Sequence, residues 1–269
     1  MAPSNYTMGS PRIQPPSRSL GMLLIALVAV WLAFAVSINW ASSSEDLFWL
    51  LTGDSSLVLR GQLWRLATAP IMHDPVGSGG VNHILSTVVG LFFLAPALES
   101  EWGTRRLLRF LAVSSIFAYS MQWVLCILLP IGAVQRLVPP HWFGAMPALE
   151  AVAIAFALNM RDRSVLLFFV LPIGSRGLLF ATIGISAALV AAGAIGPSGA
   201  IAPFAGMLAG WLFGGSTPSP MRRFWLRWRL RRLEVEAIGD REKRRAIAKR
   251  RFEVLPGGLD KKQKDRYLH

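Results

Sequence analysis

The sequence predicts an all-α membrane protein: a bundle of six transmembrane helices followed by a basic C-terminal amphipathic helix. First, 53% of its 269 residues are hydrophobic. Second, these residues gather in six long runs that are nearly free of charge, as is typical of membrane spans. Third, the net charge of +13 belongs to the tail, because 17 of the 28 Lys and Arg residues follow residue 220. The remainder of the chain is close to electrically balanced.

The chain divides into three parts. Residues 1–18 are polar and rich in Pro and Ser, and we expect a disordered N-terminal tail. Residues 19–215 form the predicted membrane domain, and residues 216–269 form a basic cytoplasmic tail. The first apolar run, Leu20–Ile38, is long enough to span a bilayer. No small-residue cleavage motif precedes Trp40, so this run is interpreted as an anchor and not as a cleaved signal peptide.

The apolar runs give the positions of the six spans. They are Leu20–Ile38, His83–Leu98, Leu107–Leu129, Pro147–Met160, Leu178–Gly193 and Ile201–Gly214. The second, fourth and sixth are shorter than the roughly 20 residues of a lipid-facing span. Short helices rich in Ala and Gly usually lie inside a bundle. The loop at about residues 40–82 carries an apolar patch, Leu47–Leu51, which we expect to lie in the membrane interface.

The arginines predict the orientation. They are concentrated in the even loops and in both terminal segments, whereas the odd loops carry only Arg60, Arg65 and Arg136. The even loops carry Arg105, Arg106, Arg109, Arg161, Arg163 and Arg176. By the positive-inside rule, both termini and the even loops are cytoplasmic. An integral, multi-pass protein with this pattern fits a bacterial inner membrane or an internal eukaryotic membrane.

The sixth span carries a glycine at every fourth position. The glycines are Gly206, Gly210 and Gly214. Such a stripe allows a neighbouring helix backbone to approach closely. A dimer interface is one interpretation, but packing within the chain is favoured. The expected partner is the fourth span, which has alanines at helical spacing: Ala148, Ala151 and Ala155.

Several motifs occur in a fixed order along this pattern of spans. The first loop contains Trp64-Arg65, and His83 opens the second span with Thr87 four residues later. The turn after that span contains Glu99, Trp102 and Gly103. In order, spacing and placement, the stretch from about residue 20 to 215 resembles the rhomboid intramembrane serine proteases. The resemblance implies a six-helix rhomboid-type bundle, in which Trp64 and Arg65 brace the first loop.

The resemblance breaks at the catalytic positions. Active rhomboids open the fourth helix with Gly-x-Ser-Gly, and a histidine on the sixth helix activates that serine. Here the first motif reads Gly144-Ala145-Met146-Pro147, so Met146 stands in place of the serine, and Pro203 replaces the histidine. Thr87 replaces an asparagine that supports the oxyanion, although His83 is kept. The resemblance therefore implies an inactive member, a pseudoprotease with no catalytic residues.

The prolines at these positions suit a retained fold. Proline at the first position of a helix sacrifices no hydrogen bond and has a suitable φ. Pro147 and Pro203 are both expected at such helix starts, so the helices should form without the chemistry.

A literal Gly-x-Ser-Gly match occurs elsewhere, at Gly196–Gly199 with Ser198 at its centre. It falls between the fifth and sixth spans. Of the four histidines, only His269 follows it, at the end of the cytoplasmic tail and on the wrong side of the membrane. We interpret this stretch as a turn.

Three further groups have open interpretations. Glu150 is a carboxylate inside the fourth span, where ionisable residues are costly. It is predicted to form a repurposed polar pocket with His83 and Thr87, or, as the favoured alternative, to make one structural hydrogen bond. Glu99 or Glu101 is expected to pair with an arginine across the turn. These arginines are Arg105 and Arg106.

The tail alternates arginine with bulky apolar residues. Its membrane-surface residues are expected to be Arg222, Arg223, Trp225, Arg227, Trp228, Arg229, Arg231 and Arg232. Basic helices with tryptophan bind the surface of anionic bilayers. Arginine and aromatic residues also occur in nucleic-acid-binding proteins, but the tail directly follows a span. Anionic lipid is therefore the expected partner, and no nucleic acid is expected.

These observations favour a non-catalytic protein that binds transmembrane segments of client proteins in trafficking or quality control, as the related iRhoms and derlins do. A client helix is expected to enter between the second and fifth spans. One alternative is an active intramembrane serine endopeptidase with a non-standard catalytic set; others are a small-solute carrier and a structural scaffold. No metal-ligand cluster, phosphate loop or dinucleotide motif occurs, so we expect no metal and no cofactor.

Overall fold

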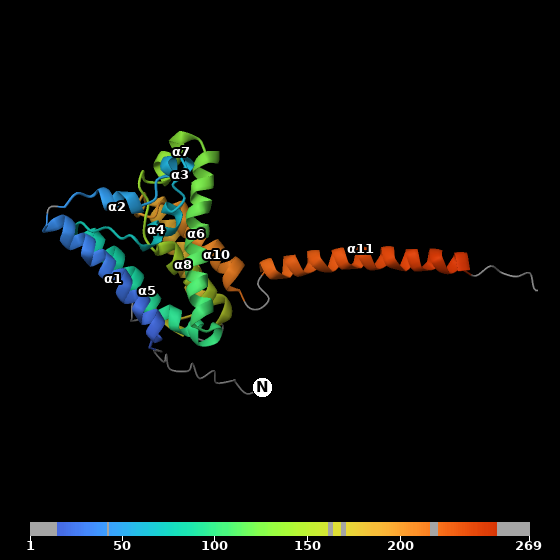
Figure 1. The fold of residues 1–269 in the computed structure, drawn as a ribbon. Coiled ribbons are helices and arrows are strands. Elements are labelled where there is room, and N and C mark those ends of the chain that lie inside the picture. Colours follow the sequence, from blue (N-terminus) through green and yellow to red (C-terminus); the bar gives the residue numbers. More distant parts are fainter. Residues whose placement is uncertain (1–14, 42, 161–163, 168–170, 216–219, 252–269) are drawn as a thin grey trace, which may run out of the picture. The chain divides into compact units, whose positions relative to one another are not determined.

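A computed structural model describes residues 15–41, 43–160, 164–167, 171–215 and 220–251 (Figure 1). The predicted N-terminal tail therefore lies mostly outside the described residues, as does the end of the C-terminal tail. The chain forms two compact units, Met1–Met221 and Arg222–His269. Each unit is described by itself.

Among the described residues, the first unit contains six longer apolar helices. They are α1 (Arg18–Asn39), α5 (Gly77–Trp102), α6 (Thr104–Leu128), α8 (Met146–Asn159), α9 (Ser175–Ala191) and α10 (Ile201–Gly214). Three of them, α1, α5 and α6, are long and apolar enough to cross a membrane. The other three have 14, 17 and 14 residues. The structure therefore gives three candidate spans and three shorter apolar helices.

Helix α5 corrects the expectation of a short second span. It has 26 residues, begins before His83 and continues through Pro96 to Trp102. Proline is tolerated inside a transmembrane helix, because neighbouring groups and small local adjustments satisfy the freed carbonyl. The helix ends at Gly103, whose φ of +77° favours glycine.

The connecting segments contain short elements. They are α2 (Asp46–Leu51), α3 (Ser55–Leu59), α4 (Arg65–Thr68), the 3₁₀ helix η1 (Ala69–Ile71), α7 (Ile131–Leu137) and the antiparallel strands β1 (Ser164–Leu167) and β2 (Leu171–Gly174). The hairpin was not expected from the sequence, since its strands are only four residues long. The apolar patch at Leu47–Leu51 forms α2. Phe48 is buried there, whereas Leu47 and Leu50 are exposed.

Helix α8 lies at the centre of the first unit and packs most closely against α10. A Cβ at Gly206 would overlap the carbonyl oxygen of Pro147. A Cβ at Gly210 would lie 2.5 Å from the Ala151 carbonyl oxygen, and one at Gly214 would lie 2.5 Å from the Ala155 Cβ. The glycine stripe thus packs within the chain, against the fourth apolar helix, as the sequence predicts.

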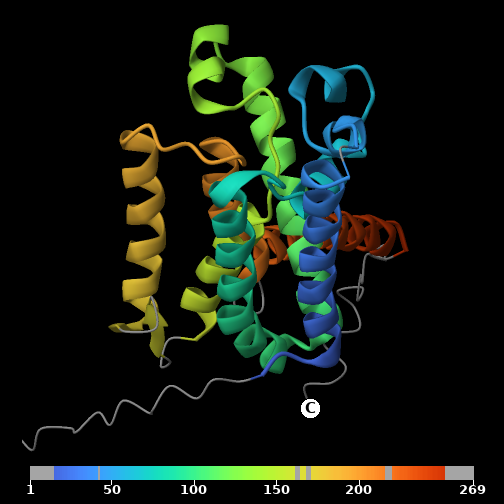
Figure 2. The ribbon, with the colours of Figure 1, turned by 90° about the vertical axis from the view of Figure 1, so that its left-hand side faces the viewer.

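The connecting segments gather at two ends of the unit. The turn from α5 to α6 and the β1–β2 hairpin lie at one end, and α3 and α7 lie at the other (Figures 1 and 2). This alternation is the arrangement expected of helices that repeatedly cross a layer. Which end faces the cytoplasm remains a prediction from the arginines.

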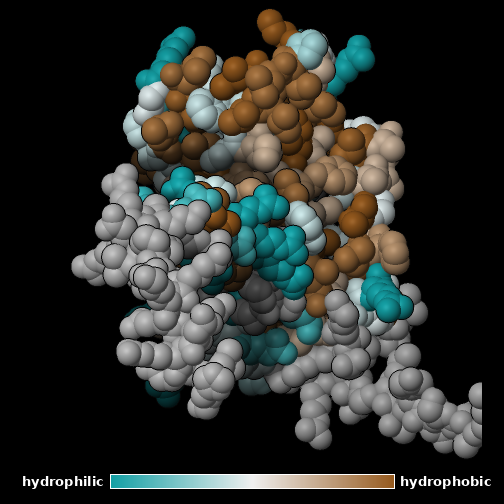
Figure 3. Space-filling model, turned by 90° about the vertical axis from the view of Figure 1, so that its right-hand side faces the viewer, coloured by the Kyte–Doolittle hydropathy of each residue, from teal (hydrophilic) through white to brown (hydrophobic). Residues whose placement is uncertain are grey.

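Many hydrophobic side chains point outward from the first unit. On α1, α6 and α9 they include Met22, Ile25, Leu32, Val113, Ile127, Leu128, Phe180, Ile183 and Leu189. Hydrophobic residues also cover much of the upper part of the face in Figure 3. Exposed apolar surface of this extent suits contact with lipid.

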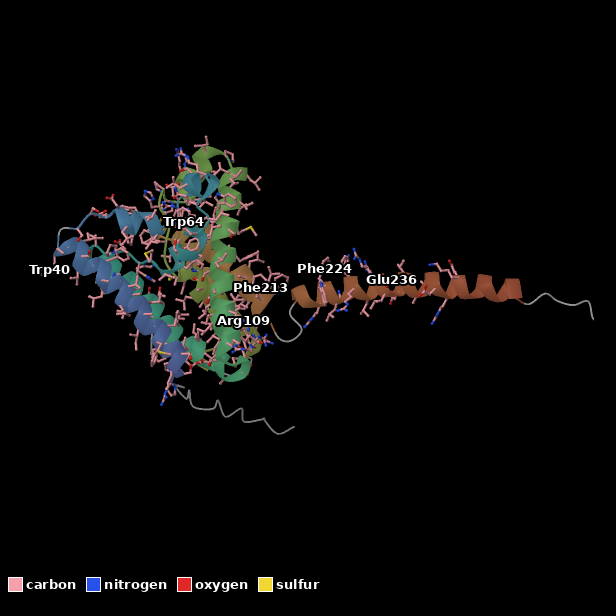
Figure 4. All side chains as sticks on the ribbon, in the orientation of Figure 1. Trp40, Trp64, Arg109, Phe213, Phe224 and Glu236 are labelled. Carbon is pink, nitrogen blue, oxygen red and sulfur yellow. The ribbon has the colours of Figure 1, made fainter. Side chains whose placement is uncertain are left out.

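The second unit contains the helix α11 (Pro220–Arg251), apart from its first two residues. Its side chains project on several sides, with Phe224 and Glu236 labelled in Figure 4. The sequence predicts an amphipathic helix. Among the described side chains of α11, the apolar residues lie mainly on two opposite faces, with Trp225 between them. Phe224 and Trp228 lie on one face, because successive residues turn by about 100° in a helix. Leu230 lies on the other.

Candidate functional site

The turn that precedes α8 is held by hydrogen bonds on both sides of Gly144. Its N–H donates to the Ala69 carbonyl at 2.9 Å, and its carbonyl accepts from the Tyr119 hydroxyl at 2.6 Å. Gly144 has a φ of +110°, which residues with a side chain rarely adopt. A Cβ at this position would also overlap the His83 ring. Glycine is therefore required by the backbone conformation and by the close approach of His83.

Two buried imidazoles lie next to this turn. The ring centroids of His73 and His83 are 4.9 Å apart. His73 Nδ1 lies 3.1 Å from the Ile71 carbonyl, to which it donates. His73 Nε2, both ring nitrogens of His83 and Thr87 Oγ1 have no hydrogen-bond partner among the described residues. Because buried polar atoms are usually satisfied, these four atoms are the unused hydrogen-bonding capacity of the site.

The charge state of His73 follows from its surroundings. Burial lowers the pKa of His73 to about 4, the adjacent His83 lowers it to a lesser degree, and the hydrogen bond to Ile71 opposes both. His73 is therefore uncharged at neutral pH. Its one N–H is already used, so the ring presents only an acceptor nitrogen towards its neighbours.

The two positions that resemble catalytic ones both lie at helix starts. Met146 is the first residue of α8, and its half-buried thioether offers neither a hydroxyl nor a thiol. Pro203 lies in α10 and has no titratable group. Contrary to the expectation, neither proline is at the first helical position. Pro147 is the second residue of α8, and Pro203 is the third residue of α10. The reasoning still applies, since the first four N–H groups of a helix have no intrahelical partner.

Ser198 lies closer to this site than its sequence position suggests. The carbonyl of the preceding Pro197 accepts a hydrogen bond from the Phe143 N–H at 3.1 Å. The turn around Ser198 therefore packs against the turn before α8, and Ser198 is buried. Within the described part of the chain, no hydrogen bond joins its hydroxyl to an imidazole. His269 lies outside the described residues.

Glu150 has its hydrogen-bond partner on α9. Its carboxylate accepts a hydrogen bond of 2.9 Å from the Ser186 hydroxyl of α9. No hydrogen bond links it to His83 or Thr87 among the described residues. The structure thus contains the hydrogen bond of the favoured alternative, and the repurposed pocket stays a prediction.

Two residues of α6 were missed in the sequence. Tyr119 holds the Gly144 carbonyl and stacks on Trp142, with ring centroids 4.7 Å apart. Gln122 is fully buried, and its Oε1 accepts from the Ala202 N–H at 2.9 Å, at the start of α10. The available signal was a polar side chain inside an apolar span, which marks a structural or functional position. Helix α6 therefore fixes the beginnings of both α8 and α10.

Trp64 and Arg65 brace the first loop. Arg65 is buried, and its Nη1 donates to the carbonyls of Trp49 and Thr52, both at 2.6 Å. Trp64 is half-exposed, and its indole donates to the Leu50 carbonyl at 3.4 Å (Figure 4). One guanidinium thus satisfies carbonyls that no helix or strand bond would satisfy.

The same loop is joined to the segment before α8. Gly53 and Trp142 exchange backbone hydrogen bonds of 2.8 and 2.9 Å. His141 Nδ1 lies 3.8 Å from the Asp54 carboxylate. Burial raises the pKa of Asp54, but hydrogen bonds, chiefly from Ser56, outweigh burial and lower it overall. The first loop is therefore attached to the segment that leads into the Gly144 turn.

Glu99 has different partners from those expected. Its carboxylate accepts hydrogen bonds from the Ser17 backbone and hydroxyl and from the Thr104 hydroxyl. Within the described residues, neither Glu99 nor Glu101 forms an ion pair with the arginines that follow the turn. Glu99 instead links the start of α1 to the start of α6.

Trp102 and Gly103 shape the same turn. The Arg106 guanidinium stacks over the Trp102 ring at 4.7 Å, as a cation–π contact. Gly103 supplies the positive φ between α5 and α6. Both residues have structural roles.

The tail residues lie on α11. Arg229 stacks over Trp225 at 5.2 Å and Arg232 over Trp228 at 3.8 Å. The other predicted membrane-surface residues on this helix are Arg222, Arg223, Arg227 and Arg231. No group of three or more His, Cys, Asp or Glu side chains in the described part of the chain is arranged to hold a metal.

Long apolar helices, a lipid-suited surface and a buried polar site between helix starts define the class: an integral membrane protein. The chain belongs to the family described as eukaryotic integral membrane protein (DUF1751), whose model matches residues 21–214. The match covers the first unit up to the end of α10 and excludes α11. No curated protein matches the chain in sequence.

Proposed function

We propose that this protein is a non-catalytic, rhomboid-like membrane protein that binds transmembrane segments of client proteins in trafficking or quality control. The observation that carries the proposal is the pair of helix starts, Met146 on α8 and Pro203 on α10. A serine–histidine mechanism needs a hydroxyl and a base at such positions. The surrounding frame of Gly144, His83 and the α8–α10 contact remains closely packed.

In this proposal the three shorter apolar helices complete a six-helix bundle. Helix α8 is almost wholly buried, so it needs no lipid-spanning length. The longer helices α1, α5 and α6 face the lipid around it. The alternation of loops between the two ends of the unit supports an even number of crossings.

The client helix is proposed to enter between α5 and α9. The face of α9 buried in the structure carries Ser175, Thr182 and Ser186, and Ser186 is tied to Glu150 of α8. Small polar side chains permit close helix contacts and interhelical hydrogen bonds within a bilayer. A client segment would be retained there by packing and would not be cleaved.

Site-specific photocrosslinking tests client binding directly. A photoreactive residue at Leu85 on α5 or at Ile183 on α9, both exposed, should capture transmembrane proteins that mass spectrometry then identifies. The matched control is Leu32, an exposed residue on α1. Capture at Leu85 and Ile183 no stronger than at Leu32 would contradict the proposal.

The second candidate function, a serine endopeptidase, is kept because Ser198 packs beside the turn before α8. A serine-reactive fluorophosphonate probe and a transmembrane reporter substrate distinguish the two functions. We expect neither labelling nor cleavage. Labelling that Ser198→Ala abolishes would replace the non-catalytic proposal with an active enzyme.

The face of α11 that carries Phe224 and Trp228 is proposed to contact anionic lipid at the cytoplasmic surface. Membership of a eukaryotic family favours an internal eukaryotic membrane. A solute carrier would need several polar groups at the bilayer midplane, whereas the Glu150 carboxylate is already hydrogen-bonded to Ser186.

If the protein were only a scaffold recruited by its tail, deletion of residues 222–269 would abolish both its localisation and its effect on clients. The client-binding proposal predicts that crosslinking at Leu85 survives this deletion.

A further inference from the structure

Helix α11 presents two apolar faces with different charged borders. The aromatic face consists of Phe224, Trp228, Val235 and Ile238, all exposed. At about 100° per residue, Arg231 lies within this face, and Arg227 and Arg232 lie at its flanks. The leucine face consists of Leu226, Leu230, Leu233 and Ala237, which are also exposed. Its flanks are mixed: Arg227 and Arg229, with Glu234 and Glu236.

These borders assign different partners to the two faces. Glu234 lies equally close to both faces, but only the aromatic face has an arginine, Arg231, within it, and an anionic bilayer attracts arginine. The aromatic face therefore suits lipid, and the leucine face suits a protein surface with charges of both signs. The aromatic face is also interrupted at its centre by Arg231, whereas the leucine face is continuous.

The leucine face has the spacing of a coiled-coil seam. Its residues are separated by four, three and four positions, as alternating d and a positions of a heptad are. The same register places Arg223 at the preceding a position and Asp240 at the following d position. A partner must therefore match four apolar layers with a basic residue at one end and an acidic residue at the other.

We propose that the leucine face binds the same face of a second copy of this chain, with the two α11 helices antiparallel. In this arrangement Leu226 lies opposite the partner's Ala237, and Leu230 lies opposite the partner's Leu233. Arg223 then lies opposite the partner's Asp240 at each end of the seam. A parallel pair would place Arg223 against Arg223 and Asp240 against Asp240, which is unfavourable.

The flanking charges agree with the antiparallel arrangement. The e positions, Arg227 and Glu234, then approach the e positions of the partner. The g positions, Arg229 and Glu236, approach its g positions. This places Arg227 beside the partner's Glu234 and Arg229 beside the partner's Glu236, each pair occurring twice by symmetry. These four pairs beside the apolar layers have opposite charges, whereas the same register brings Arg222 near the partner's Lys243, a like-charged pair. Four layers form a short seam, but anchoring both chains in one membrane raises their effective concentration.

Disulfide trapping in vesicles tests this arrangement with full-length protein carrying Cys126→Ala, which removes the single cysteine. Leu226→Cys and Ala237→Cys chains, reconstituted together, should form a mixed disulfide under mild oxidation. Leu226→Cys chains alone should not, because these positions lie at opposite ends of the seam. Phe224→Cys chains are the control on the aromatic face.

Two outcomes of the trapping experiment overturn the proposal. A Leu226→Cys homodimer stronger than the mixed product would show a parallel pair. A mixed product no stronger than that of the Phe224→Cys control would show that the leucine face has no second copy against it.

Charge reversal tests the pairing without cysteine. The double change Glu234→Arg and Glu236→Arg should weaken the apparent association of labelled full-length chains about tenfold. Energy transfer between the labels measures this association. Adding Arg227→Glu and Arg229→Glu to the same chain should restore association, because the pairs are reversed and not removed. Failure of this rescue, in a chain that still extracts as folded protein, contradicts the antiparallel pairing.

Lipid is the competing occupant of the leucine face. Trp228→Ser should weaken binding of the full chain's tail to anionic surfaces, measured by tryptophan accessibility in phosphatidylserine vesicles, and leave self-association unchanged. Leu230→Ser should weaken self-association and leave binding of the tail to anionic surfaces unchanged. If Leu230→Ser alters lipid contact and leaves self-association unchanged, the face belongs to the membrane and not to a second copy.

Discussion

Around Gly144 the positions of individual atoms decide which residues are allowed. Its N–H and carbonyl are both bonded, and its α-carbon faces the His83 ring without room for a methyl group. Met146, two residues later, is under no comparable constraint, since it is half-buried at a helix start. The geometry of this turn is therefore maintained by the neighbours of Met146 and not by Met146 itself.

Gly144→Ala should lower the free energy of unfolding by about 2 kcal/mol or more, because it adds positive-φ strain to overlap with His83. Reversible unfolding in detergent micelles, followed by circular dichroism, measures the effect. The control is Gly184→Ala on α9, where a Cβ meets no atom within 4 Å and alanine favours the helix. Equal stability of the two variants would contradict the packing described for Gly144.

His73 should make stability depend on pH between about 6.5 and 4. The unfolded histidine has a pKa near 6.5, and burial lowers the folded value to about 4. As pH falls through this window the unfolded chain binds a proton that the folded chain does not, so the free energy of unfolding decreases. The total loss is at most about 3 kcal/mol and levels off below pH 4.

Unfolding titrations of the wild type and of His73→Gln, recorded at several pH values, measure this contribution. The variant should show a flatter profile from pH 6.5 to 4, even if its stability at pH 7 is lower. Parallel profiles for the two proteins would mean that His73 is not the group responsible.

At the scale of elements, α6 positions the site without contributing to its chemistry. Tyr119 and Gln122 lie one turn apart and hold the starts of α8 and α10 respectively. The glycine stripe of α10 then packs the two helices along their length. Three helices together therefore set the arrangement of the site. A substitution in α6 should alter the stability of the start of α10.

Gln122→Met tests this coupling, because methionine fills a similar volume and cannot accept the Ala202 N–H hydrogen bond. Loss of the buried bond should cost about 1–3 kcal/mol. It should also accelerate amide hydrogen exchange at the start of α10, around residues 201–204, more than in α1. Leu128→Ala, an exposed change on the same helix, is the control; similar exchange in both variants would show that Gln122 does not fix α10.

At the scale of the whole molecule, the chain separates into two compact units. The buried hydrophobic clusters of the described chain consist of residues from the first unit. The family match also ends at residue 214. The first unit therefore contains its own core, and the described residues of α11 contribute to none of these clusters.

Truncation after Met221 should leave the first unit folded, because a domain with its own core can fold alone. Its Tm in detergent should stay within about 2–4 °C of the full chain, the shift that ~1 kcal/mol produces at this size. Thermal melts of both proteins measure this. A large drop in Tm would show that α11 stabilises the bundle.

The sequence predicted most helices closely, and it predicted the glycine contact between α8 and α10. The predictions from the sequence failed where contacts between residues distant along the chain determine the structure. The length of α5 was underestimated, because its first turns are glycine-rich and its proline looked like an end. Glu150 was grouped with His83 and Thr87, but Ser186 of α9 is its partner, and no local pattern predicts that pairing.

By itself the sequence determined the class of protein, the apolar helices and the absence of a serine or histidine at Met146 and Pro203, since these depend on composition and residue identity. The tertiary structure decided which polar groups meet. Tyr119, Gln122, Glu99 and the histidine pair at 73 and 83 acquire their roles from hydrogen bonds or ring contacts with residues distant along the chain or in other elements. Such contacts arise only when helices pack, because buried polar atoms then require partners that sequence neighbours cannot provide.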